Sequence, residues 1–183
     1  MKYIDGNETT SVLNSINPNQ TEALLNSDDG LTLIMGGRYE NGRALVFYQE
    51  FVATSFLEIR NLDRNMDFFV NIAKWLTRGF CIVLSECVIS IDKYKSYLIK
   101  DYLVVIYPQS VNVNTSDPEL IKKIKSGRWG IIFAGDYFST IQNTHTELMK
   151  KFGICPTKMR NIIKPGTVKW CEKVIQTTDK ICG

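Results

Sequence analysis

A cysteine, the single histidine of the chain and a nearby glutamate are the residues whose types could perform nucleophilic catalysis. Cys87 follows an apolar run at residues 81–84, and Glu147 lies two positions after His145. A cysteine nucleophile needs a histidine to take its proton and a carboxylate to orient that histidine. Cys87, His145 and Glu147 therefore define one hypothesis, a Cys-dependent enzyme.

The surroundings of these residues favour a non-catalytic interpretation. Cys87 lies in the stretch SECVIS, which contains no glycine to permit the strained turn that exposes a nucleophile. His145 falls in the first turn of a predicted helix, where the helix dipole disfavours the imidazolium that a general base must become. We therefore expect a buried thiol at Cys87 and a surface position for His145.

Polar residues follow three of the predicted strands directly. Because the carboxyl ends of parallel strands meet at one edge of a sheet, where such folds bind ligands, we expect these residues to converge there. The predicted ligand-binding residues are Gln49, Glu50, Ser85, Glu86, Asp136 and Tyr137. The chain has no second histidine to activate Ser85. The carboxylates of the set also fit the general tendency of polar residues to gather where buried strands reach solvent.

Apolar runs and helix-type periodicities alternate along the chain. The runs predict strands at 31–36, 43–49, 81–84, 102–108 and 129–135. The periodic segments predict helices within 17–25, 62–76, 92–100, 116–124 and 144–152, and in the tail from Thr167 onwards. This order predicts an α/β fold with three layers, in which helices cover both faces of a mostly parallel sheet and an antiparallel hairpin lies at one edge. Residues 1–29 are expected to form a polar N-terminal segment with a short helix, and residues 30–183 a single domain.

Capping residues and glycines indicate where several of these helices begin and end. Capping signals precede three helices, at residues 17–20, 116–119 and 144–147, and the first two contain a proline suited to the first helical turn. Glycines that can end a helix follow at Gly79, Gly127 and Gly153.

The charge balance gives no indication of nucleic-acid binding. Lysine and arginine number 22 against 19 aspartate and glutamate, for a net charge of +3, and most basic residues are dispersed. One basic group, Lys122, Lys123, Lys125 and Arg128, has the spacing of a solvated helix face. Neither a signal-peptide pattern nor a membrane-spanning apolar stretch is visible, so we expect a cytoplasmic protein without membrane insertion.

The cysteine and histidine content argues against a metal site. The five cysteines form no C-x-x-C pair, so neither a zinc site nor a disulfide framework is indicated. A zinc peptidase of the H-E-x-x-H type needs two histidines on one helix, and this chain has one in total. We expect no metal and no cofactor.

Three stretches carry a resemblance to a known family: GGRYENGRALVFYQEF, NMDFFVNIAKWLTRG and LIKKIKSGRWGIIFAG. They resemble the non-catalytic glutamine-amidotransferase-like domain of the TRP channel-associated factors and their enhancin-like zinc-peptidase relatives, over roughly residues 30–155. The chain departs from that pattern where Gln49 and Glu50 stand in place of a His-Glu pair. It also has Gly127-Arg128-Trp129-Gly130 in place of a glycine triplet.

The resemblance implies a flavodoxin-like or class I amidotransferase-like fold without catalysis. The expected function is binding, either of a protein partner, with a membrane channel possible by analogy, or of a small polar ligand at the strand ends. The alternative is a Cys-dependent amidotransferase or hydrolase that uses Cys87, His145 and Glu147. A third expectation is that the chain is one piece of a larger protein.

Overall fold

A computed structural model of the 183-residue chain describes the parts of the protein from which the fold is built. The described residues are 3–4, 8–10, 13–27, 30–47, 66–80, 88–90, 101–108, 117–134, 143–156, 161–163 and 166–170.

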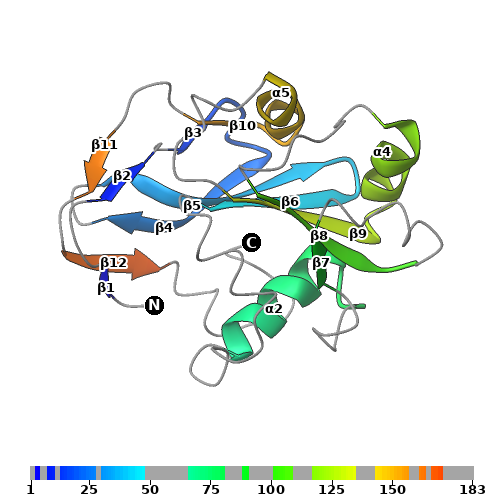
Figure 1. Cartoon of the computed structure of the whole chain (residues 1–183), viewed down its shortest axis with the longest axis horizontal. Helices are drawn as coiled ribbons and strands as arrows, with labels where there is room; N and C mark the ends of the chain where they lie inside the picture. Colours follow the sequence, from blue (N-terminus) through cyan, green and yellow to red (C-terminus); the bar gives the residue numbers. More distant parts are fainter. Residues whose placement is uncertain are drawn as a thin grey trace.

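Within these ranges, one mixed sheet of eight strands forms the centre of the molecule (Figure 1). In sheet order the strands are β1 (Tyr3–Ile4), β12 (Gly166–Trp170), β4 (Thr21–Ser27), β5 (Thr32–Tyr39), β6 (Gly42–Phe47), β9 (Trp129–Ala134), β8 (Leu103–Pro108) and β7 (Val88–Ser90). Pairing is antiparallel from β1 to β6 and parallel from β6 to β7. The sheet therefore has an antiparallel half and a parallel half.

Two small antiparallel ribbons accompany the main sheet. One pairs β3 (Leu13–Ser15) with β10 (Ile154–Pro156), and the other pairs β2 (Glu8–Thr10) with β11 (Asn161–Ile163). Both ribbons join the beginning of the chain to its later part, since their partners are far apart in the sequence.

Strands β8 and β9 of the parallel half are buried on both faces, as their sequence predicts. In β8 the side chains from Leu103 to Ile106 have no exposed surface, and neither do those from Ile131 to Phe133 in β9. Continuous β-branched and aromatic runs of this kind are typical of parallel strands that are covered above and below. The predictions of strands at 102–108 and 129–135 are confirmed.

Three described helices provide that cover: α2 (Met66–Leu76), α4 (Pro118–Lys125) and α5 (Asn143–Lys151). Apolar residues of α4 and α5, such as Leu120 and Met149, pack in one core cluster with Val105 and Ile131 of the sheet. Helix α2 covers the opposite face, where Leu76 lies directly against Gly130. Figure 1 shows α4 and α5 on one side of the sheet and α2 on the other. Helices thus lie on both faces of the parallel half.

The helix ends follow the sequence signals closely. Asp117 caps α4 by accepting a hydrogen bond from the backbone N–H of Glu119 at 3.0 Å, with Pro118 in the first turn. The predicted box placed the cap one residue earlier, at Ser116, so the cap position was wrong by one residue. Glycines with positive φ follow all three helices, at Gly79, Gly127 and Gly153, as predicted.

One predicted helix is wrong and a second is wrong at its start, because the residues described there are strands of the main sheet. The segment predicted as a helix within 17–25 is instead a turn followed by β4, which pairs with β5 and β12. Asn17 accepts hydrogen bonds from the backbone of Asn19 and Gln20, so its capping potential closes a turn rather than a helix. The tail predicted as a helix from Thr167 begins with β12, and residues 171–183 lie outside the described residues.

The predicted sheet also needs correction. The α/β class is confirmed, but "mostly parallel" is wrong, because the described sheet is antiparallel from β1 to β6. The hairpin predicted at an edge exists as β5 and β6, yet it lies in the middle of the sheet, because β4 and β12 extend the sheet beyond it. The strand predicted at 81–84 and the helix predicted at 92–100 fall outside the described residues.

We predict that Gly130→Ala destabilises the protein by about 2 kcal/mol, because overpacking a rigid core costs about 1–3 kcal/mol. A Cβ on Gly130 would clash with the Cβ of Leu76 and lie 3.1 Å from the backbone of that residue. Gly36→Ala is the matched control, since its Cβ would meet its neighbours at ordinary distances of 3.5 Å or more. Urea unfolding of both variants tests this, and equal stability of the two would contradict the packing of α2 on β9.

Candidate functional site

The predicted ligand-binding residues all lie outside the described residues, as does Cys87. The two strands that precede four of them are neighbours, and their last residues, Phe47 and Ala134, are paired in the parallel register. The described strand nearest to Cys87 is β7, which begins at the following residue, Val88. The hypothesis expected a strand before Cys87, at 81–84. The ligand-binding set and the Cys-dependent site both stay predictions.

His145 lies at the carboxyl edge of the parallel strands, and it is buried. Its side chain is only 3% exposed, so the predicted surface position is wrong. The first turn of α5 places the imidazole edge-on to two rings, with centroid distances of 5.5 Å to Tyr107 and 6.4 Å to Phe133. These rings stack on each other at 5.6 Å, so His145 completes an aromatic cluster over the ends of β8 and β9.

Burial keeps the His145 imidazole neutral. Loss of hydration lowers its pKa below the ordinary value of 6.5. Its Nε2 atom has no hydrogen-bond partner among the described residues. Glu147 is exposed and pairs with Lys150 at 2.7 Å, so its carboxylate is engaged away from the imidazole. The structure describes two of the three residues in the Cys-dependent hypothesis, His145 and Glu147, and the Glu147 carboxylate does not orient the His145 imidazole.

We predict that the stability contributed by His145 is lost as the pH falls below about 6.5, the ordinary value for histidine. The folded-state pKa is lowered, so the unfolded chain binds more protons at acidic pH and folding weakens there. His145→Leu removes this titration. The unfolding free energy of the variant should therefore depend less on pH between about 7.5 and about 5 than that of the wild-type chain. Urea unfolding across that range measures the effect. An unchanged slope in the variant would contradict a neutral, buried imidazole.

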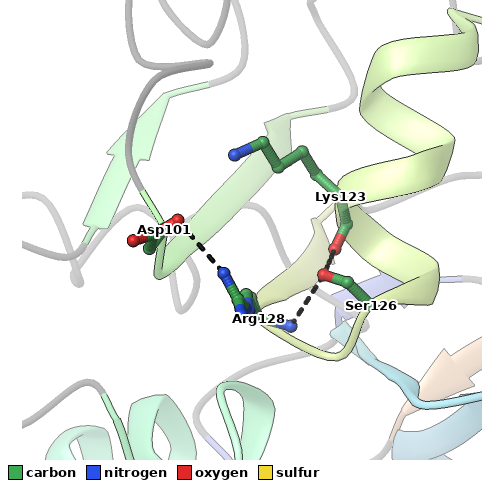
Figure 2. Close-up of polar contacts among 4 residues, drawn as sticks. All are labelled: Asp101, Lys123, Ser126 and Arg128. Carbon is green, nitrogen blue, oxygen red and sulfur yellow. Dashed lines mark hydrogen bonds and ion pairs between the residues drawn. The ribbon is translucent and has the colours of Figure 1, made fainter.

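The opposite, amino edge of the parallel strands carries an exposed surface that the ligand prediction did not include. Phe80, just after α2, is 55% exposed and stacks on Tyr102 with ring centroids 4.2 Å apart. The guanidinium of Arg128 lies 5.7 Å from the centre of the Tyr102 ring. Asp101 pairs with Arg128 at 3.2 Å (Figure 2). We name these four residues the aromatic–arginine surface.

The turn between α4 and β9 holds Arg128 in place. The Ser126 hydroxyl donates to the backbone carbonyl of Lys123 at 2.6 Å and accepts from the backbone N–H of Arg128 at 3.3 Å (Figure 2). Gly127, with positive φ, lets the chain reverse between them. This local network turns Arg128 towards Asp101 and Tyr102.

Three further arginines lie beside this surface, and we name them the arginine cluster: Arg38, Arg43 and Arg78. Arg38 and Arg43 are directly opposite each other in the β5–β6 hairpin. The carbonyl of Trp75, at the end of α2, accepts from Arg43 Nη1 at 2.8 Å and from the Arg78 backbone at 3.2 Å. Burial, followed by the charges of Arg38 and Arg78, lowers the pKa of Arg43. The amino edge is therefore locally crowded with positive charge.

The sequence contains a signal for part of this arrangement. A two-residue hairpin turn at Glu40 and Asn41 fixes the register of the flanking strands and so sets Arg38 opposite Arg43. Arg128 was already visible within the basic group. Phe80 and Arg78 join them only through the packing of α2 against β6 and β9, which no local pattern encodes.

The fold resembles part of a known peptidase. The IMPa metallopeptidase from Pseudomonas aeruginosa superposes with a TM-score of 0.61 at 12% sequence identity, over 84% of this chain and 20% of that chain. The same enzyme in complex with an O-glycopeptide gives 0.57 at 12% identity, over 89% of this chain and 22% of that one. A complex of IMPa metallopeptidase with T-antigen gives 0.59 at 11% identity, over 85% and 20%. This chain thus spans about a fifth of the length of the structures that it matches.

No protein-family model matches the sequence, and no curated protein does. At these identities the structural likeness concerns the fold alone. Among the described residues, no three histidine, cysteine or carboxylate side chains group as metal ligands. The described helices are all too short to cross a bilayer.

Proposed function

We propose that this chain is a non-catalytic protein-binding domain that holds its partner at the amino edge of the parallel strands. The observation that carries the proposal is the aromatic–arginine surface, where an exposed phenylalanine stacks on a tyrosine beside an arginine fixed by an aspartate. Aromatic residues and arginine are the types enriched at the centres of protein interfaces. Their side chains are already ordered by stacking, so binding costs little further entropy.

The size and fold of the chain support a role as a module of a larger protein. The structures it matches are metallopeptidases of which it covers about a fifth. A chain with one histidine cannot itself supply the two histidines of an H-E-x-x-H zinc site. Its single histidine is buried among the described residues and has a lowered pKa, so it is inaccessible and only a weak general base.

The resemblance to TRP channel-associated factors supports a protein as the partner. By that analogy, we propose a membrane channel or a trafficking component, reached from the cytoplasm, as the class of partner. The IMPa structures with T-antigen and with an O-glycopeptide make a glycosylated peptide a useful probe as well.

We predict that a display library of random peptides yields sequences that bind the wild-type chain. The Phe80→Ser variant should bind these peptides at least about tenfold more weakly, as expected for an interface hot spot. Ile16→Ser is the matched control, because Ile16 is also 55% exposed but belongs to the segment between β3 and β4. Affinities measured by fluorescence anisotropy should fall for the first variant alone.

Two outcomes would contradict the proposal. Equal weakening by both substitutions would mean that exposed apolar side chains bind peptides without a defined site. Cleavage of an enriched peptide or of an O-glycopeptide during the incubation, detected by mass spectrometry, would mean that the chain is an enzyme.

A further inference from the structure

Three arginines, Arg38, Arg43 and Arg78, come together at the amino edge of the described structure. Arg38 and Arg43 occupy a directly opposed pair of the β5–β6 hairpin, where like charges repel. The Arg43 guanidinium lies 5.1 Å from the centre of the Trp75 ring and donates to the carbonyl of that residue. The backbone N–H of Arg78 donates to the same carbonyl, and the charge of the Arg78 side chain acts on the Arg43 guanidinium.

Two of the carboxylates described at this edge pair with other basic residues. Glu40, at the hairpin turn, pairs with Lys125 at 2.7 Å, and Asp101 pairs with Arg128 at 3.2 Å. No described carboxylate forms an ion pair with any member of the arginine cluster. Among the described residues of this edge, basic side chains therefore outnumber acidic ones, although the chain as a whole carries only +3.

A purely structural role accounts for one of the three arginines. Arg43 caps the C-terminus of α2, where the helix dipole favours a cation. The exposed side chains of Arg38 and Arg78 make no such contact among the described residues. Arg78 also has a positive φ of 56°, a conformation in which asparagine or glycine costs less than arginine. Its side chain lies against Gly127 and so towards the aromatic–arginine surface.

We propose that the arginine cluster binds the carboxylates of an acidic peptide segment, whose apolar residues contact Phe80. This inference rests on the proposed protein-binding function and names the chemistry of the partner. Guanidinium groups form paired hydrogen bonds with carboxylates, and an anionic partner offsets the repulsion within the cluster. Only Gly79 separates Arg78 from Phe80, so one extended segment can reach both.

The distribution of charge favours a peptide over a nucleic acid. Nucleic-acid sites need a basic stripe that tracks a phosphate backbone, and here Asp101 and Glu40 interrupt the basic residues of the edge. The cluster is also spread over a hairpin and a helix end, whereas a small phosphate is held by a compact loop of backbone N–H groups. Mixed acidic and apolar side chains fit the mixed basic and aromatic edge better.

The test compares a twelve-residue peptide rich in glutamate and aspartate, containing one tryptophan, with its glutamine and asparagine analogue. The full chain should bind the acidic peptide at least about tenfold more tightly, the factor expected for charge-assisted hydrogen bonds. The double substitution Arg38→Gln and Arg78→Gln should remove most of that difference. The control Lys122→Gln and Lys151→Gln makes the same change in net charge at exposed positions of α4 and α5 and should have less than about a threefold effect.

A stability measurement separates binding from a structural role. Arg38→Gln removes one of two opposed positive charges, so the midpoint of urea unfolding should stay unchanged or rise. A lower midpoint together with weaker binding would mean that Arg38 supports the fold, and the proposal would be overturned.

Three binding results would also overturn it: equal affinity for the amide analogue, an equal effect of the lysine control, or displacement of the acidic peptide by millimolar inorganic phosphate. None of these results would overturn the proposed function, which is tested by the affinity of the Phe80→Ser variant for the library-selected peptides. If the library yields no binding peptide at all, both the proposed function and the acidic-peptide inference are overturned.

Discussion

Burial of the parallel strands β8 and β9 on both faces is the constraint on which the rest of the structure depends. The side chains of β8 and β9 alternate between the layer of α4 and α5 and the layer of α2, and none of those from Ile131 to Phe133 reaches solvent. Two-sided burial leaves only the ends of these strands and the outer surfaces of the helices accessible. In this half of the sheet, the two strand edges are therefore the places where side chains from several elements can form one accessible site.

The two edges have opposite chemical character. At the carboxyl edge, the described residues bury His145, whose neutral imidazole lies edge-on to the rings of Tyr107 and Phe133. The amino edge instead exposes Phe80 and concentrates guanidinium groups around the end of α2 and the turn after α4. An uncompensated charge and a solvent-exposed aromatic side chain both lower stability, so their presence at one edge favours a role in binding rather than in folding.

The sequence predicted those elements that local chemistry specifies. Helix α4 shows this: Pro118 and Gly127 mark its ends, and its buried residues repeat at helical spacing. The strands β4 and β12 could not be predicted in this way, because their conformation comes from pairing with each other and with β5. The polar residues around Asn17 fit a helix cap and a turn equally well, and only the long-range pairing decides between them.

The site was less predictable than the fold, for the same reason. The position of His145 in the first turn of a helix could be read from the sequence, but its burial depends on where Tyr107 and Phe133 lie. The expectation of a ligand site at the carboxyl edge came from the general behaviour of parallel sheets. The amino-edge surface combines side chains from α2, the β5–β6 hairpin and the segments before β8 and β9, so only the assembled sheet reveals it.

Amide hydrogen exchange measured by NMR tests the two-sided burial most directly. Amides of β8 and β9 should exchange only through global unfolding, with protection that matches the free energy from denaturant unfolding. Amides of the outlying strand β1 should exchange faster, through local opening. Exchange of β8 and β9 amides as fast as those of β1 would contradict a buried parallel core and, with it, a fixed amino-edge surface.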